Sequence, residues 1–135
     1  MTSTVVYDGA LRTTCIHLRS SDSFETDAPV DNNGKGERFS PTDLLATSLA
    51  TCMITVMGIK ARSLGFDLDG MKVDVEKIMK PNPRRVGGIN LVFQIPENLM
   101  QLDEKTKEVL KTIGKTCPVQ QSLNPEVEVN IDWNW

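Results

Sequence analysis

Residues 40–53 read SPTDLLATSLATCM, and this run carries the strongest structural signal in the chain. Ser40 suits the N-cap of a helix, Pro41 suits the first helical position, and Asp43 suits the third position of a capping box. The apolar residues continue beyond the run until a glycine follows Leu64. Because glycine commonly ends a helix, the sequence predicts one long helix from the Ser40 cap to Leu64.

The predicted helix is apolar almost all the way round, and Cys52 lies in its middle. Its larger apolar residues do not form a single stripe, because the other side is filled by Ala46, Ala50, Ile54 and Met57. A helix without a polar face is buried on nearly all sides. A chain of 135 residues has difficulty enclosing such a helix alone, so we expect a homodimer in which the partner covers it.

A second cysteine follows a second predicted helix. Asp103 suits the N-cap of that helix, which runs over residues 104–115 with lysines opposite its apolar stripe. The motif Cys117-Pro118-Val119 then begins a new short helical turn. Backbone N–H groups and the helix dipole at such a start favour an anion, so Cys117 is a candidate thiolate. The alternative is a capping or packing cysteine.

Composition indicates a globular chain. Hydrophobic residues make up 39% of it and charged residues 24%. The net charge is −3 and aromatic residues make up only 5%, so neither a phosphate backbone nor stacked bases are expected partners, and we predict no nucleic acid.

The chain gives no sign of export or membrane insertion. Its first residues lack the basic start and apolar run of a secretory signal, and its three cysteines are an odd number, so we expect reduced thiols in the cytoplasm. We also expect no membrane-spanning segment, because the apolar stretch over residues 44–59 is interrupted by Thr47, Ser48, Thr51 and Thr55.

Strand patterns lie on both sides of the long helix. Residues 5–28 are expected to form three strands, the first two joined by a hairpin turn at Asp8-Gly9. Residues 71–78 and 86–95 form a second predicted pair, and residues 126–133 close the chain as a strand. This order predicts an α+β fold with largely antiparallel sheets, in a single domain over residues 1–135.

A cysteine reacts as its thiolate, and burial alone raises the thiol pKa and makes it inert. A reactive Cys52 therefore needs a neighbouring cation. Arg38, just upstream of the helix, is one candidate, and Arg12, on a strand of the same or a partner subunit, is another. The alternative for Cys52 is a small core residue, and that reading is favoured for the mid-strand Cys15.

Other chemistries find little support in the sequence. His17 is the only histidine and no Cys-x-x-Cys pair exists, so we expect no metal site. No serine or cysteine has a histidine base at a known motif spacing, and Gly34-Lys35-Gly36 is too short to cradle a phosphate. We therefore expect no cofactor.

The run from Ser40 to Cys52, joined to Cys117-Pro118-Val119, resembles the OsmC/Ohr family, in the branch with a Ser-Pro-Thr helix start. The resemblance covers nearly the whole chain. It implies a cytoplasmic α+β protein in which antiparallel sheets wrap around a long buried central helix. It further implies an intertwined homodimer with active sites at the subunit interface, and a thiol peroxidase for organic hydroperoxides.

In this resemblance Cys52 is the peroxidatic thiolate, which attacks the peroxide O–O bond and becomes a sulfenic acid. Cys117 resolves it as an intramolecular disulfide. An external dithiol, lipoylated or thioredoxin-like, then reduces that disulfide. The apolar lining, which includes Leu44, Leu45 and Met53, favours apolar hydroperoxides over hydrogen peroxide.

One position departs from the family pattern. Family peroxidases carry a glutamate after the helix-start proline, where it pairs with the activating arginine; here that position is Thr42. Asp43 lies about 100° further round the helix, and Glu37 is an alternative carboxylate. The departure motivates a second hypothesis, a dimer of the same fold with little peroxidase activity that binds a small apolar or thiol-containing ligand. In a third, all three cysteines are core residues of an interaction module.

Overall fold

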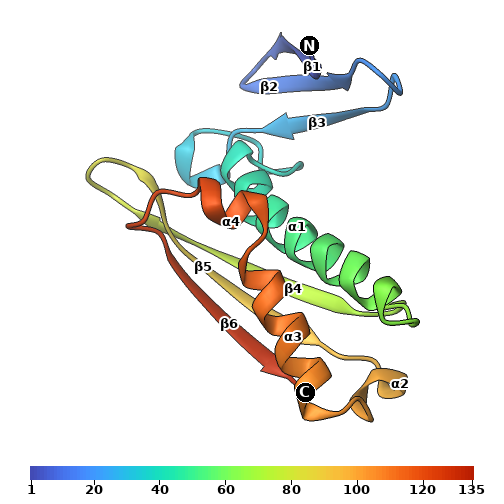
Figure 1. Cartoon of the computed structure of the whole chain (residues 1–135). Coiled ribbons are helices and arrows are strands. Elements are labelled where there is room, and N and C mark those ends of the chain that lie inside the picture. The colour runs from blue at the N-terminus through green and yellow to red at the C-terminus, as the bar shows by residue number, and fades with distance from the viewer. The chain divides into compact units, whose positions relative to one another are not determined.

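The computed structural model describes residues 1–135 and alternates strands with helices as the sequence predicts, which confirms the α+β class. The elements, labelled in Figure 1, are β1 (Ser3–Gly9), β2 (Arg12–His17), β3 (Ser23–Asp27), a 3-10 helix (Val30–Asn32), α1 (Pro41–Ser63), β4 (Lys72–Lys80), β5 (Arg85–Gln94), α2 (Glu97–Met100), α3 (Glu104–Lys115), α4 (Pro118–Ser122) and β6 (Glu128–Asn134). Contacts divide the chain into two compact units, Met1–Leu45 and Ala46–Trp135. The expectation of one domain over the whole chain stays a prediction.

The first unit, Met1–Leu45, contains an antiparallel sheet in the order β1-β2-β3. The predicted hairpin turn at Asp8-Gly9 was wrong by two residues, because the turn is made by Ala10 and Leu11, which have φ angles of 49° and 62°. The register shifts between Tyr7 and Gly9, and the Asp8 carboxylate accepts a hydrogen bond from the Thr14 hydroxyl on β2 at 2.6 Å. Asp8 thus lies within β1, at the irregularity of its pairing with β2, and not in the turn.

The second unit, Ala46–Trp135, contains a sheet in the order β4-β5-β6. Strands β4 and β5 are antiparallel, whereas β5 and β6 are parallel, an exception to the largely antiparallel expectation. Parallel neighbours need a long crossover connection, and the helices α2, α3 and α4 supply it. One sheet face is apolar and buried, with Ile89, Leu91 and Phe93 of β5 at its centre.

Helix α1 begins as the sequence predicts. The Ser40 backbone N–H donates to Asp43 Oδ2 at 2.8 Å, and the Asp43 N–H donates to Ser40 Oγ at 3.1 Å, which is a reciprocal capping box. The helix ends at Ser63, one residue before the predicted end, and Gly65 adopts a φ of +90° just beyond it. A left-handed conformation at this position favours glycine and terminates the helix.

Only one face of α1 is buried within the chain. The buried stripe consists of Ala46, Leu49, Ala50, Met53, Met57 and Ala61. Helix α3 packs closely there, since a Cβ added at Gly114 would lie 3.0 Å from Met57 Sδ. On the opposite face Leu45 is 40% exposed and Ile59 is 66% exposed. A single chain therefore leaves these two apolar side chains of α1 uncovered, beside the exposed Thr51 and Thr55, and the expected homodimer stays a prediction.

The expectation that no segment could span a membrane needs correction. Helix α1 has 23 residues, and an 18-residue window in it has a mean hydropathy of 1.6, so its length and composition suffice to cross a bilayer. The interrupting hydroxyls lower the hydropathy too little, and those of Thr51 and Thr55 donate back to helix carbonyls at 3.0 and 2.8 Å. The core helix of a soluble protein passes the same test, and the buried stripe of α1 forms part of such a core.

Candidate active site

The two cysteines that the sequence singles out lie together in the second unit. Cys52 occupies the middle of α1, is partly exposed and packs against the hydrophobic core. Cys117 lies between the end of α3 and the start of α4 and is 0% exposed. Both thiols are free. Two residues far apart in the sequence thus lie in the same unit.

The backbone around Cys117 is fixed by its neighbours. Its N–H donates to the Gly114 carbonyl at 3.2 Å, which ends α3, and its Sγ accepts a hydrogen bond from the Gln120 N–H at 3.4 Å. Pro118 occupies the first position of α4, where a missing N–H is harmless. The predicted short helical turn is therefore observed, with Cys117 as its N-cap.

The pKa of the Cys117 thiol is raised from its ordinary value. Burial is the main cause, the Gln120 N–H acts in the opposite direction, and a hydrogen bond and charge interaction with the Cys52 thiol raise the pKa further. Cys52 also packs against the core cluster that contains Cys117, so the two thiols lie in the same part of the unit. The raised pKa keeps the Cys117 side chain protonated at neutral pH.

In the first unit Arg12 is held by two carboxylates. Its Nε and Nη2 donate to the two oxygens of Asp27 at 2.7 and 2.9 Å, and Nη2 also donates to Glu37 Oε2 at 2.9 Å. Asp27 is only 2% exposed and also accepts the Glu37 backbone N–H at 3.1 Å. This Arg12 cluster, made of Arg12, Asp27 and Glu37, fixes the guanidinium in one orientation.

The charges of the Arg12 cluster support one another. The hydrogen bond from Arg12 lowers the pKa of Asp27 below its usual value, and burial acts in the opposite direction. The same bonds, that with Asp27 first, raise the pKa of Arg12, so the guanidinium stays charged. Sequence reasoning missed Asp27. The available signal was the antiparallel register, which places Asp27 directly opposite Arg12 on β3 and β2.

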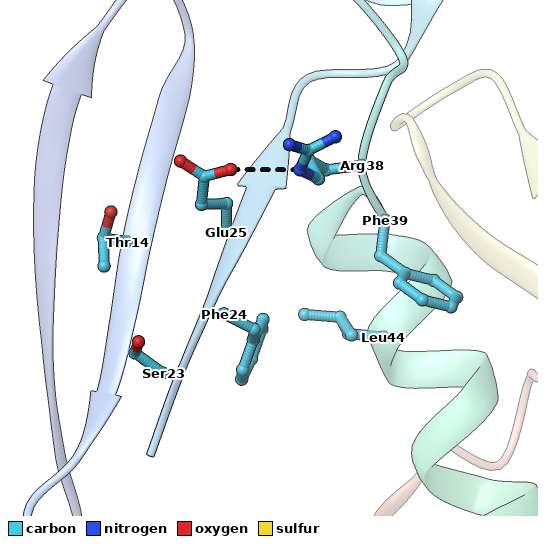
Figure 2. A pocket seen from close by; sticks show the side chains of 7 residues that line it. All are labelled: Thr14, Ser23, Phe24, Glu25, Arg38, Phe39 and Leu44. Carbon is cyan, nitrogen blue, oxygen red and sulfur yellow. Dashed lines mark hydrogen bonds and ion pairs between the residues drawn. The ribbon is translucent and has the colours of Figure 1, made fainter. Parts of the chain in front are cut away.

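Arg38, the other candidate cation, has a different partner. Its Nε donates to Glu25 Oε2 at 3.0 Å, and both side chains are about half exposed. This ion pair borders an open pocket of about 660 Å³ in the first unit, which is lined by Thr14, Ser23, Phe24, Glu25, Arg38, Phe39 and Leu44. Figure 2 shows the ion pair at one end of the pocket and the apolar side chains Phe24, Phe39 and Leu44 at the other.

The remaining candidates have structural roles. The Asp43 carboxylate accepts the Ser40 N–H and belongs to the helix start. The Thr42 hydroxyl, at the position where family peroxidases carry a glutamate, lies 3.1 Å from Ser40 Oγ. Cys15 lies in β2 opposite Val5 and Phe24. The structure thus joins Cys52 with Cys117 in one unit, and Arg12 with Glu37 in the other.

Comparisons with known proteins give a consistent result. The family model described as OsmC-like protein matches residues 34–132. A Psychrobacter arcticus 273-4 protein, named for an osmotic stress induced and detoxification response, is 46% identical with a TM-score of 0.94, and the match covers 99% of this chain and 96% of that one. No curated protein sequence matches.

Two more distant structures share the fold. The organic hydroperoxide resistance protein OsmC of Legionella pneumophila is 17% identical with a TM-score of 0.75, over 100% of this chain and 98% of that one. The organic hydroperoxide resistance protein OhrB of Bacillus subtilis is 17% identical with a TM-score of 0.65, over 99% and 98%. At this identity the likeness shows the α+β architecture alone.

Proposed function

Because this chain belongs to the OsmC-like protein family, we propose that it is a thiol-dependent peroxidase that reduces organic hydroperoxides in oxidative stress defence. The observation that carries the proposal is that Cys52 packs against the core cluster of the second unit that contains Cys117, with an interaction between the two thiols that raises the pKa of Cys117. Relatives named for organic hydroperoxide resistance support the same class of substrate.

The proposed cycle uses the two thiols in turn. The Cys52 thiolate attacks one oxygen of the hydroperoxide, the O–O bond breaks, and the alkoxide leaves as an alcohol after it takes up a proton. Cys52 is then a sulfenic acid. The Cys117 sulfur attacks the Cys52 sulfur, water leaves, and a disulfide joins the two residues. Cys117 suits the second role because it is buried in the core cluster against which Cys52 packs, and its thiol proton joins the departing hydroxide to form water.

We further propose Arg12 as the cation that stabilises the Cys52 thiolate, from the same or a partner subunit. Thr42 stands where family peroxidases carry a glutamate. In the Arg12 cluster the carboxylates of Asp27 and Glu37 bind the guanidinium in place of that glutamate. Asp27 and Glu37 engage Nε and Nη2, so the Nη1 group is the one left to meet an anion. A guanidinium held in place needs little reorganisation when charge develops on sulfur. Arg38 is more exposed, and its pairing with Glu25 is open to solvent.

The uncovered face of α1 supports the homodimer. A second copy packed against Leu45 and Ile59 would remove their apolar surface from water, at about 25 cal/mol for each Å². We propose that the protein is cytoplasmic. A dithiol of the lipoyl or thioredoxin-like type then regenerates its reduced cysteines.

A direct test measures consumption of cumene hydroperoxide by the reduced protein together with the loss of free thiols. We expect one hydroperoxide to be consumed and two thiols to be lost per chain, and the Cys52→Ser variant to consume none above background. The matched control is Cys15→Ser, which removes a thiol from β2 and should behave like the wild type. Unchanged consumption by Cys52→Ser would end the peroxidase proposal.

The alternative function is a dimer of the same fold with little catalysis that binds a small apolar or thiol-containing ligand. The observation that favours it is Thr42, whose hydroxyl is engaged with Ser40 at the helix start, in place of the family glutamate. Alkylation kinetics separate the two functions. A Cys52 thiol that reacts no faster at neutral pH than the thiol of a small peptide supports the binding protein, whereas a much faster reaction supports the peroxidase.

A further inference from the structure

The second unit contains an open groove between α1 and α3, here called the α1–α3 groove. It has a volume of about 460 Å³ and is lined by Lys60, Lys105, Glu108, Val109, Thr112 and Ile113. The first of these residues belongs to α1 and the others belong to α3. Neither Cys52 nor Cys117 lines the groove, so it is separate from the candidate active site.

The groove lies on the side of α1 that faces α3, which runs beside it (Figure 1). Lys60 follows the buried Met53 by about two helical turns, so the two side chains leave α1 on the same side. Met53 faces α3, since a Cβ added at Gly114 would lie 3.5 Å from its Cε. The exposed Ile59 is about 100° away from Lys60 around the helix. The groove is therefore distinct from the α1 face that we expect a second copy to cover.

Part of the groove surface is apolar. Val109, Leu110 and Ile113 form the apolar stripe of α3, but only Leu110 among them is fully buried. Val109 and Ile113 are partly buried and lie outside the hydrophobic core. The apolar stripe of α3 is thus wider than the surface that the core covers, and the remainder lines the groove.

The groove also carries positive charge, although the net charge of the chain is −3. The ammonium groups of Lys60 and Lys105 make no ion pair within the chain. Glu108 is the one acidic residue of the lining, and Lys111 Nζ donates to its Oε1 at 2.8 Å. This bond lowers the pKa of Glu108, so the carboxylate is ionised and Lys111 neutralises it. The charges of the two unpaired lysines are therefore available to an anion.

We propose that the α1–α3 groove binds a small amphipathic carboxylate, with its carboxylate group at Lys60 and Lys105 and its apolar chain against Val109 and Ile113. The groove volume is within the range of about 300–1,000 Å³ that is typical of small-molecule sites. A lysine ammonium group only donates hydrogen bonds and an ionised carboxylate only accepts them, so the two groups are complementary. This second binding site does not depend on the proposed peroxidase cycle.

Other occupants match the groove less well. A second copy that placed Leu45 and Ile59 of its own α1 there would bury two lysine charges without a carboxylate, which is costly. A small inorganic anion would leave the apolar surface in contact with water, and an uncharged apolar molecule would leave the lysines unpaired. A molecule that joins a carboxylate to an apolar chain satisfies both parts of the groove.

The test titrates the reduced protein with octanoate, below the concentration at which octanoate forms micelles, and follows chemical shifts by NMR. We expect saturable shifts at Val109, Thr112 and Ile113. Octanol, which lacks the charge, and acetate, which lacks the chain, should each bind at least about fivefold more weakly. The first-unit pocket also joins a cation to apolar side chains, but Arg38 is already paired with Glu25 there. No saturable binding, equal binding of octanol, or shifts confined to the first-unit pocket would overturn the inference.

Substitutions then examine the charges of the groove one by one. Lys60→Gln and Lys105→Gln should each weaken octanoate binding about threefold, whereas the control Lys72→Gln, at an exposed lysine of β4, should not. Glu108→Gln should tighten binding, because it removes an anion from the groove and releases Lys111. Tighter binding cannot result from a loss of folded structure. Weaker binding by Glu108→Gln, or equal effects of Lys72→Gln and Lys105→Gln, would contradict the assignment.

Discussion

Arg12 and Asp27 lie opposite each other on β2 and β3 and form a two-bond ion pair, with Nε–Oδ1 and Nη2–Oδ2 distances of 2.7 and 2.9 Å. Asp27 also accepts the backbone N–H of Glu37, so one buried carboxylate joins the sheet to the loop that leads into α1. The pair therefore orients the guanidinium and anchors the loop at the same time.

The first prediction concerns acid stability. Because Arg12 lowers the pKa of Asp27, the carboxylate contributes stability that is fully present above its unfolded pKa, about 3.9, and is lost as the pH falls through the lower folded value. We expect Asp27→Asn to be less stable than the wild type at neutral pH and to lose less stability below about pH 4. Urea unfolding at several pH values measures this. Asp69→Asn, a change at an exposed aspartate, is the control, and parallel pH profiles for wild type and Asp27→Asn would contradict the prediction.

The second prediction separates the two arginines. If Arg12 stabilises the Cys52 thiolate, Arg12→Ala should slow alkylation of Cys52 by iodoacetamide about tenfold at neutral pH. Arg38→Ala, which removes the solvent-exposed partner of Glu25, should leave the rate nearly unchanged. Far-ultraviolet circular dichroism checks that both variants remain folded. The reverse order of effects would assign the role to Arg38.

The third prediction tests the start of α1. Ser40→Ala removes the hydroxyl that caps Asp43 and should lower the free energy of unfolding by about 1 kcal/mol. Ser63→Ala, at the other end of the same helix, removes only an exposed hydroxyl that bonds back to Lys60 and is the matched control. Thermal or urea denaturation gives both values. A loss no larger than that of the control would mean that the cap is not needed.

The fourth prediction tests the uncovered face of α1. Ile59→Lys places a charge where we expect the partner subunit and should raise the dimer dissociation constant at least about tenfold, because an unpaired charge is costly to bury. The control, Met100→Lys, introduces the same charge at an exposed residue of α2. Sedimentation or light scattering over a range of concentrations gives the result. A wild-type protein that stays monomeric at high concentration would exclude the dimer.

The fifth prediction concerns the resolving thiol. In Cys117→Ser the sulfenic acid on Cys52 has no neighbouring thiol to condense with, so dimedone should label Cys52 after peroxide treatment far more than in the wild type. Cys15→Ser should show the low labelling of the wild type. Equal labelling in the wild type and in Cys117→Ser would remove Cys117 from the cycle.

Local signals in the sequence predicted the elements well. The Ser40–Asp43 capping box, the Asp103 cap of α3 and the Pro118 start of α4 are all observed, because each depends on hydrogen bonds between residues close in the chain. Where a prediction needed a contact across strands, it was less accurate. The β1–β2 turn lies at Ala10-Leu11 and not at Asp8-Gly9, because Gly9 pairs with Arg12 across the strands.

The partners of the charged candidates could not be predicted. Glu37 and Arg38 are adjacent in the sequence, yet Glu37 binds Arg12 of β2 and Arg38 binds Glu25 of β3. Adjacent side chains point in different directions, and only the strand register decides which distant group each one meets. Asp27 went unnoticed for the same reason, since an aspartate before a proline-containing loop carries no local signal for an ion pair.

The sequence by itself determined the order of the main helices and strands and the caps that begin α1, α3 and α4. It also singled out Cys52 and Cys117 as candidate redox residues. Propensity, capping and periodicity act over a few neighbouring residues, so they can be read without the tertiary structure. Only the tertiary structure decided that Cys52 and Cys117 lie in the same part of the second unit, that Cys117 is the buried member of the pair, and that Arg12 is held by Asp27 and Glu37. Those relationships arise from the packing of α1 against α3 and from the pairing of β2 with β3, where apolar burial and strand register act between residues far apart in the chain.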